Sequence, residues 1–298
     1  MRLIFLSGLS GSGKSVALHM LEDLGYYCID NMPAALLRPF ISHTVRGNNP
    51  AYARTAVGLD ARNTDTEIAT VPALIDEFKR SGIDCEVIFL VANQDELLRR
   101  FAETRRAHPL RQGGADLRGA IAEERRLLEP LLSAADLVID STNIGVHELR
   151  ELIKQRVAGG APERLSILFE SFGYKHGIPA DADFVFDVRA LPNPYWDKSL
   201  RALSGRDEAV IRYLDAEPAA QQYIADLIRF MDARIPEYRA GNRRYLTVAI
   251  GCTGGQHRSV YIVEKLAIHY GSGHPEVRLR HSALGETGSF ASSSAQRA

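Results

Sequence analysis

The stretch that decides the fold is Leu3-Ile-Phe-Leu-Ser-Gly-Leu-Ser-Gly-Ser-Gly-Lys-Ser15. It joins an apolar run, typical of a buried strand, to the phosphate-loop pattern G-x-x-x-x-G-K-[ST], and helical periodicity follows up to Leu24. The glycines let successive amides converge on phosphate oxygens, and the helix adds the positive end of its dipole. We expect Lys14 to act catalytically by bridging the β- and γ-phosphates, and Ser15 to hold Mg²⁺. The predicted ATP contacts are Gly8, Leu9, Ser10, Gly11, Ser12, Gly13, Lys14 and Ser15.

Apolar runs alternate with helical patterns through the N-terminal half, as in βαβ units. The predicted strands are Leu3–Leu6, Tyr26–Ile29, Ala56–Leu59, Val87–Val91 and Leu137–Ile139. The predicted helices are Ser15–Leu24, Pro33–Val45, Glu67–Arg80, Asp95–Arg106, Leu117–Leu132 and Val146–Val157. This pattern predicts an α/β fold, with a phosphate-loop, kinase-like parallel sheet and helices on both of its faces.

A glycine- and proline-containing stretch, Ala158–Glu163, interrupts the alternation and is the predicted domain boundary. A smaller C-terminal α/β domain follows, with strands at Leu165–Phe169, Phe184–Val188 and Tyr245–Ile250 and helices at Gln222–Met231 and Ser259–Tyr270. Periodicity is lost over residues 271–298. We therefore predict a nucleotide domain at 1–157, a regulatory domain at 164–282 and a mobile tail at 283–298.

The composition is that of an ordinary globular protein, with 298 residues, 45% hydrophobic residues and a net charge of −1. Any attraction to nucleic acid must therefore come from a local patch. Cys28, Cys85 and Cys252 lie too far apart for a disulfide framework or for paired metal-ligand spacing. Because no signal peptide or membrane-spanning run is evident, we expect a cytoplasmic protein.

A phosphate loop also needs a carboxylate on a neighbouring strand to reach the magnesium ion. Asp60 follows one apolar run and is the first choice for this metal and catalytic role, with Asp140 as an alternative and a turn cap as the structural explanation. Asp30 and Asn31 could also lie beside the nucleotide, although an N-cap role is favoured. The densest positive stretch either covers the triphosphate or forms a solvated helix face, and it contains Arg99, Arg100, Arg105, Arg106 and Arg111, with Glu103 opposing.

A second glycine-rich loop, Gly251–Ser259, also stands between a predicted strand and a predicted helix. We expect it to bind an anion, with Arg258 suited to a phosphate monoester. Cys252 and Arg258 also have the C-x-x-x-x-x-R spacing of cysteine phosphatases, although Gly251 stands where those enzymes usually have His. Loops after two other strands offer further candidates for this pocket, namely Ser171, Lys175, His176 and Arg189.

Long motifs resemble the RapZ family of bacterial nucleotide-binding proteins, also called YvcJ-like or RNase adapter proteins. They are GLSGSGKSVALHMLEDLGYYCIDNMP, LDARN, TRRAHPL, LFESFGYKHGIPADADFVFDVRALPNPYW and YLTVAIGCTGGQHRSVYIVEKLA. The resemblance runs from residue 1 to about residue 281. It implies ATP at Gly8–Ser15, GTP at Asp60-Ala61-Arg62-Asn63, and weak ATPase and GTPase activity.

The resemblance also implies that the C-terminal domain senses glucosamine 6-phosphate. Together with the second loop, this predicts effector contacts at Ser171, His176, Arg189, Cys252, Thr253, Gly254, Gly255, His257, Arg258 and Ser259. Enteric members are oligomers that present a small regulatory RNA to an endoribonuclease. In those members, a tail rich in lysine and arginine contacts the RNA. The corresponding stretch here, Lys265–Ala298, is only weakly basic, with four Lys or Arg against two Asp or Glu. Arg278 and Arg280 are the remaining predicted RNA contacts, with a solvated edge strand as the alternative.

Three functions follow from these patterns. The first is a nucleotide-dependent regulatory adaptor with RNA as its output. The second is a small-molecule kinase, although the N-terminal half shows no assignable acceptor pocket. The third is a phosphomonoesterase that uses Cys252, although neither a histidine before the cysteine nor a general acid can be assigned.

Overall fold

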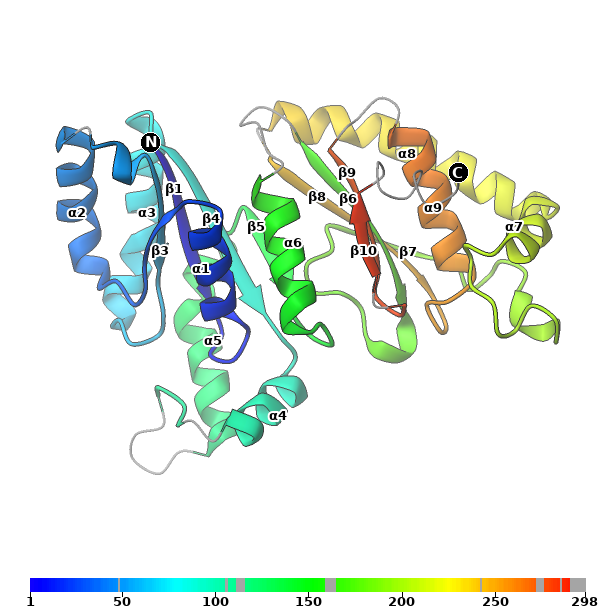
Figure 1. Cartoon of the computed structure of the whole chain (residues 1–298), viewed down its shortest axis with the longest axis horizontal. Coiled ribbons are helices and arrows are strands. Elements are labelled where there is room, and N and C mark those ends of the chain that lie inside the picture. Colours follow the sequence, from blue (N-terminus) through cyan, green and yellow to red (C-terminus); the bar gives the residue numbers. More distant parts are fainter. Residues whose placement is uncertain are drawn as a thin grey trace. The chain divides into compact units, whose positions relative to one another are not determined.

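The computed structural model describes residues 1–47, 49–104, 107–110, 116–158, 165–241, 243–271, 276–284 and 286–289. The chain divides into two compact units, Met1–Ala158 and Gly159–Ala298. Each unit has its own sheet and is described by itself (Figure 1). Apart from Ala158, the predicted boundary segment lies outside the described residues.

The N-terminal unit is built on a five-stranded sheet in the order β2-β3-β1-β4-β5. Its strands are β1 (Arg2–Gly8), β2 (Tyr27–Ile29), β3 (Arg54–Gly58), β4 (Asp84–Val91) and β5 (Leu137–Asp140). All neighbouring strands are parallel, so their carboxyl ends lie at one edge, where the phosphate loop follows β1. The predicted α/β class, the phosphate-loop topology and all five strands are confirmed.

Six α-helices connect or follow these strands in the described part of the unit. They are α1 (Lys14–Asp23), α2 (Ala34–Gly47), α3 (Asp65–Arg80), α4 (Gln94–Thr104), α5 (Leu117–Ser133) and α6 (Val146–Ala158), with a short 3₁₀ turn, η1, at Pro50–Tyr52. A capping box between Thr64 and Glu67 begins α3, because each residue satisfies a backbone N–H of the other. Helices α1 and α6 pack together on one face of the sheet and α3 and α5 on the other (Figure 1), as predicted.

Alternate residues of the strands fill the core beneath α2, α3 and α5. Leu3 and Phe5 of β1 are fully buried there with Val71 of α3 and Leu128 of α5. Because both faces of the sheet are covered, the strands read as continuous apolar runs. This burial is what allowed them to be predicted from hydrophobicity alone.

The C-terminal unit has a five-stranded sheet in the order β10-β9-β6-β8-β7. Its strands are β6 (Ser166–Gly173), β7 (Phe184–Asp187), β8 (Tyr245–Cys252), β9 (Val277–His281) and β10 (Glu286–Ser289). The first four run parallel, and β10 pairs antiparallel with β9. The loops that follow β6 and β8 therefore leave the sheet at the same edge.

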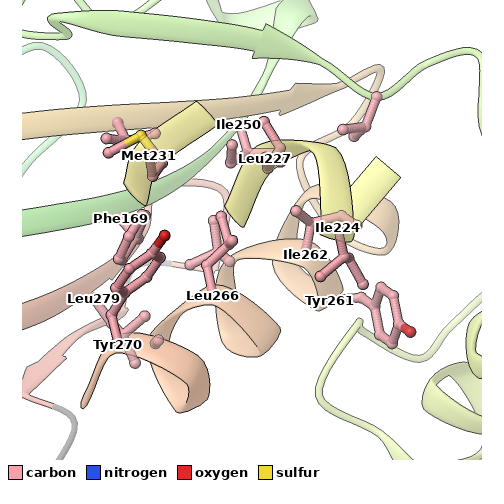
Figure 2. Packing of buried hydrophobic residues seen from close by; sticks show 14 of the residues in the cluster. Phe169, Ile224, Leu227, Met231, Ile250, Tyr261, Ile262, Leu266, Tyr270 and Leu279 are labelled. Carbon is pink, nitrogen blue, oxygen red and sulfur yellow. The ribbon is translucent and has the colours of Figure 1, made fainter. Parts of the chain in front are cut away.

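Three α-helices complete the described part of this unit, α7 (Glu208–Asp215), α8 (Pro218–Ala240) and α9 (Arg258–Gly271), with 3₁₀ turns η2 (Tyr174–His176) and η3 (Pro194–Trp196). Figure 2 shows side chains of α8, such as Leu227 and Met231, in one cluster with Leu266 of α9. Phe169 and Ile250 add the contribution of β6 and β8 to the same cluster. Since successive strand residues point to opposite faces, the neighbour Glu170 faces away from it.

Three sequence predictions for this unit were wrong or incomplete. Helix α8 spans 23 residues, well beyond the predicted Gln222–Met231, and α7 was not predicted. The stretch 271–298, predicted to lack regular structure, contains β9 and β10. Strand β9 was missed because Arg278 and Arg280 break its apolar pattern, and their neighbours in the fold come from distant parts of the chain.

In the described part of the chain, every helix is too short or too polar to cross a lipid bilayer.

Candidate functional site

The loop between β1 and α1 has the backbone curvature that its glycines predict. Gly11 and Gly13 have φ angles of 88° and 104°, which side chains with a Cβ rarely adopt. A Cβ on Gly13 would also lie 2.5 Å from Cδ2 of Leu149. The loop therefore needs glycine at this position for two independent reasons.

Four loop amides are available to a ligand. Ser12 N–H donates to Leu9 O at 3.0 Å and Leu9 N–H to Leu90 O at 3.2 Å, which closes the base of the loop. Among the described residues, no acceptor is found for the N–H groups of Gly11, Gly13, Lys14 and Ser15. They stand at the N-terminus of α1, where backbone donors and the helix dipole favour an anion.

Lys14 supplies the cation of this site. Its Nζ donates to Gly8 O at 2.7 Å, so the side chain lies back over the loop. Burial lowers the pKa of Lys14, while the charges of Glu124, Asp60 and Asp30 act to raise it. The positive charge of Lys14 thus interacts with three carboxylates, and it would also interact with a bound phosphate group.

Asp60, the first choice for magnesium, lies just after β3, whereas Asp30, predicted only to lie beside the nucleotide, follows β2. Asp60 is buried, and its two oxygens accept from Arg62, from N–H at 3.0 Å and from Nη1 at 2.9 Å. Asp30 accepts from Asn31 N–H at 2.8 Å, and Asn31 has a left-handed φ of 52°. Asp140 instead accepts from the N–H of Thr142, at the other side of the sheet.

The donor set suits magnesium, because Mg²⁺ prefers hard oxygen ligands and keeps several waters. Ser15 offers a hydroxyl on the first turn of α1, and Asp30 and Asp60 both act electrostatically on Lys14 beside it. Across the described residues, no group of three or more His, Cys, Asp and Glu side chains could hold a metal. A cation here would thus also need oxygens from a bound phosphate.

The segment predicted to contact GTP is held by its own hydrogen bonds. Asn63 Oδ1 accepts from Ala34 N–H at 2.7 Å, and its Nδ2 donates to the carbonyls of Met32 and Asp60. Ala61 is buried. The side chain of Asn63 therefore begins α2 and ties β2 to β3, and a guanine could use it only if these bonds broke.

The arginines of α4 are engaged in ion pairs. The sequence suggested Glu103 as the only acid opposing these arginines. In the structure, Arg99 pairs with Glu96 as well as with Glu103. Arg100 donates to the carbonyl oxygens of Gly11 at 3.0 Å and Ser141 at 2.6 Å, which braces the phosphate loop from outside. Arg105, Arg106 and Arg111 lie outside the described residues.

The second glycine-rich loop, between β8 and α9, converges on a thiol. Cys252 Sγ accepts from Gly255 N–H at 3.2 Å and lies 3.2 Å from the hydroxyl of Ser259. Burial alone would raise the pKa of Cys252, but hydrogen bonds from Ser259 and Gly255 and the charge of Arg258 bring it below its ordinary value. These contacts favour the ionised form of Cys252 more than in an ordinary buried cysteine.

The basic side chains of the second loop point away from it. Arg258 is buried, and its Nη1 donates to the carbonyls of Arg189 at 2.7 Å and Leu191 at 3.0 Å. His257 Nε2 lies 3.1 Å from Leu200 O, and burial lowers the pKa of His257. Arg258 therefore braces the chain after β7, and a phosphate in the loop would meet mainly backbone donors.

The loops after β6 and β8 lie against each other, as expected for one pocket. Lys175 N–H donates to the carbonyl of exposed Thr253 at 3.3 Å, and a Cβ on Gly173 would lie 2.7 Å from Gly254 C. His176 is exposed on η2. Of the residues predicted for the pocket, Lys175 and His176 thus lie on the loop that adjoins Thr253 and Gly254.

Two of the predicted pocket residues have other partners. Arg189 pairs with Asp187 and stacks over the ring of Tyr174, 4.0 Å from its centroid. Ser171 is buried, and its hydroxyl lies 2.8 Å from Nδ1 of His281. Ser171 therefore faces β9.

The predicted RNA contact at Arg280 needs correction. Its side chain is 3% exposed and pairs with Glu170 and Asp181, 110 and 99 residues away. Arg278 is 14% exposed and pairs with Glu276. Neither guanidinium is a solvated edge cation, because β10 covers that edge of β9. The sequence could not reveal this, since the acids that neutralise Arg280 are remote in the chain.

Sequence reasoning also missed two residues at the phosphate loop, Glu124 and His108. Glu124 of α5 is fully buried, and both Ser10 and His108 hydrogen-bond to its carboxylate. His108 lies in one of the motifs quoted above, but neither residue has a pattern of its own that would mark this role.

Comparison with known proteins finds one family match for each of the two units. Residues 1–161 match the RapZ-like N-terminal domain and residues 165–285 the RapZ C-terminal domain. A relative from Marinobacter nauticus named "Nucleotide-binding protein" is 49% identical over 285 residues, with 95% of this chain and 97% of the relative covered. A protein of the same name from Alkalilimnicola ehrlichii is 51% identical over 284 residues, with 95% and 98% covered.

Solved structures similar to about half of this chain include shikimate kinase from Bacteroides thetaiotaomicron, at 18% identity and a TM-score of 0.32, covering 51% of this chain and 98% of that one. Deoxyadenosine kinase from M. mycoides is 15% identical with a TM-score of 0.31, covering 54% and 100%. These scores are too low to carry a functional argument. The two domain matches and the full-length relatives, in contrast, show that this chain belongs to the RapZ family.

Proposed function

We propose that this protein is a nucleotide-binding regulatory adaptor whose N-terminal loop holds the phosphates of ATP or GTP with Mg²⁺. The observation that carries the proposal is the set of four N–H groups without an internal acceptor at the start of α1, with Lys14 beside them. Ser15 and Asp60 would hold the magnesium ion, and Lys14 would stabilise charge on the phosphates. The names of the relatives agree with nucleotide binding.

Any hydrolysis is expected to be weak. Arg99 and Arg100 are the described members of the arginine run that could cover the triphosphate. Both are paired with Glu96. An arginine that stabilises transferred phosphoryl charge must be able to reach it. This favours a role in which nucleotide occupancy, rather than rapid turnover, is the signal.

The second loop is proposed to bind a sugar phosphate, namely glucosamine 6-phosphate. Support comes from the strand–loop–helix geometry of β8 and α9, the adjoining loop after β6 and membership of the RapZ family. On the basis of the same family membership, the protein is proposed to form an oligomer and to present a small RNA to an endoribonuclease. Since Arg280 is buried, other cations would have to contact the RNA.

The test is calorimetric titration of the full-length chain with Mg-ATP, Mg-GTP and glucosamine 6-phosphate. Lys14→Met should weaken nucleotide binding by at least about tenfold and leave the sugar phosphate unaffected. Gly254→Asp should weaken binding of the sugar phosphate and leave nucleotide binding unaffected. Open space surrounds Gly254, so the new side chain fits, and its carboxylate would repel an anion. Gly254→Ala is the matched control. If wild-type protein binds none of the three ligands, the proposal fails.

A second candidate function is a cysteine phosphatase, favoured by the hydrogen bonds that stabilise the Cys252 thiolate. Against it, the thiol is 3% exposed and Arg258 is turned towards two carbonyls. Hydrolysis of an aryl phosphate that disappears in Cys252→Ser would establish it. Hydrolysis that persists in that variant would eliminate it.

A further inference from the structure

The apex of the phosphate loop is held by a side chain from outside the loop. Glu124 Oε2 accepts from Ser10 N–H at 2.8 Å, and Glu124 Oε1 accepts from the Ser10 hydroxyl at 2.6 Å. One carboxylate of α5 thus takes both donors of a loop residue that lies 114 positions earlier. Because both donors are used, Ser10 points towards α5 and is not itself a phosphate ligand in this arrangement.

His108 completes the carboxylate's environment. Its Nε2 lies 3.1 Å from Glu124 Oε2, and its Nδ1 accepts from Leu110 N–H at 3.2 Å. An Nδ1 that accepts a hydrogen bond carries no proton, so Nε2 bears the hydrogen and donates it to Glu124. The ring of Phe101 packs against His108 with centroids 5.2 Å apart. The imidazole is therefore fixed in one tautomer and one orientation.

The side chains of Glu124 and His108 are both 0% exposed. Burying an ionised carboxylate is unfavourable unless hydrogen bonds and opposite charge compensate. Burial alone would raise the pKa of Glu124, but hydrogen bonds from His108 and Ser10 and the charge of Lys14 bring it below the ordinary value. The carboxylate is thus ionised and can accept all three hydrogen bonds.

This arrangement leaves the remaining loop donors free. Glu124 takes the donors of Ser10, Leu9 takes the N–H of Ser12, and the amides of residues 11 and 13–15 have no acceptor among the described residues. From the other side, Arg100 holds the carbonyl of Gly11. The loop is thus braced at both sides of its apex before any ligand arrives, which lowers the entropy cost of binding.

We propose that Glu124 and His108 are positioning residues for the nucleotide site, acting through Ser10 to hold the phosphate loop in its binding shape. This rests on the proposed nucleotide binding and extends it to two residues that the loop motif does not contain. Neither side chain touches the nucleotide. Their effect is on affinity, since a loosened loop must be ordered again each time a nucleotide binds.

The test measures ATP affinity of the full-length chain by calorimetry, with magnesium present, for three variants. Glu124→Ala removes all three acceptor contacts and should weaken ATP binding at least about tenfold. Glu124→Gln should stay within about threefold, because its oxygen can accept from Ser10 N–H and His108 while the Ser10 hydroxyl turns to accept from its amide. Glu123→Ala, the same change on the exposed neighbouring residue, should bind as wild type.

If Glu124→Ala does not fold, as judged by circular dichroism, the pair His108→Gln and His108→Leu replaces it. Glutamine can still donate to Glu124 and should keep ATP affinity, whereas leucine cannot and should lower it at least about fivefold.

The outcomes separate two failures. Wild-type protein that binds neither ATP nor GTP would overturn the proposed nucleotide site, and this inference with it. Wild-type protein that binds ATP, with Glu124→Ala folded and within twofold of it, would overturn the positioning role alone. Equal weakening in Glu124→Ala and Glu124→Gln would also overturn it, because charge would then matter and the hydrogen bonds would not.

Discussion

The two glycine-rich loops each join the carboxyl end of a parallel strand to a helix, yet they use their donors differently. In the N-terminal loop, four amides have no acceptor among the described residues and Lys14 lies over the loop backbone. In the C-terminal loop, Gly255 N–H and Ser259 converge on Cys252, and Arg258 is bonded to carbonyls outside the loop. A strand–loop–helix pattern thus predicts that backbone N–H groups converge on one point. The neighbouring side chains decide whether a protein group or a ligand accepts their hydrogen bonds.

The largest expected effect contrasts a glycine from each loop. Gly13→Ala should lower the free energy of unfolding by about 2 kcal/mol or more and abolish nucleotide binding, because φ is 104° and the new Cβ would lie 2.5 Å from Leu149 Cδ2. Gly254→Ala should change stability by less than about 0.5 kcal/mol, since open space surrounds it. Urea denaturation of both variants measures the contrast. Similar losses in the two would show that the loops are equally constrained.

The next effect concerns the cation of the second loop. Arg258→Lys should destabilise the protein by about 1–3 kcal/mol, because an ammonium on a shorter stem does not reach the two carbonyls to which Arg258 Nη1 donates. Thermal unfolding with and without glucosamine 6-phosphate measures it. A variant with unchanged stability would mean that Arg258 is free to serve a ligand, as Lys14 is.

A third prediction addresses the acids that neutralise Arg280. Burial raises the pKa of Glu170 to about 7, despite the opposing charge of Arg280. A carboxyl whose pKa is higher in the folded than in the unfolded state favours folding at low pH, and that stability is lost as pH rises from about 4.5 to 7. Glu170 should therefore contribute a loss of stability as pH rises through this range, and Glu170→Gln should remove that contribution. Parallel slopes in urea denaturation would contradict this.

The smallest effect is expected at the ion pair between exposed Arg62 and buried Asp60. Arg62→Ala should change stability by no more than about 0.5 kcal/mol, because the Arg62 side chain is 58% exposed and Asp60 keeps its hydrogen bond from the N–H of residue 62. It should leave Asp60 able to serve magnesium, so ATP affinity in magnesium should not fall. A marked loss of affinity would instead give Arg62 a direct part in nucleotide binding.

Much of the N-terminal half could be predicted because its signals are local. The curvature at Gly11 and Gly13 and the helix that begins at Lys14 all follow from one short motif. The buried strands were recognisable because both faces of that sheet are covered. In the C-terminal half, β9 escaped prediction because Arg278 and Arg280 interrupt its apolar pattern, and the acids that pair with buried Arg280 lie elsewhere in the chain.

By itself, the amino-acid sequence determined the α/β class, the phosphate loop and the second loop, because glycine conformation and hydrophobic periodicity act between neighbours. Only the tertiary structure decided which groups those loops meet. Ser10 meets Glu124 across 114 residues, and Arg280 meets Glu170 across 110. The physical reason is that a buried polar group must find its partner in space, and nothing in its neighbours along the chain states which one that is.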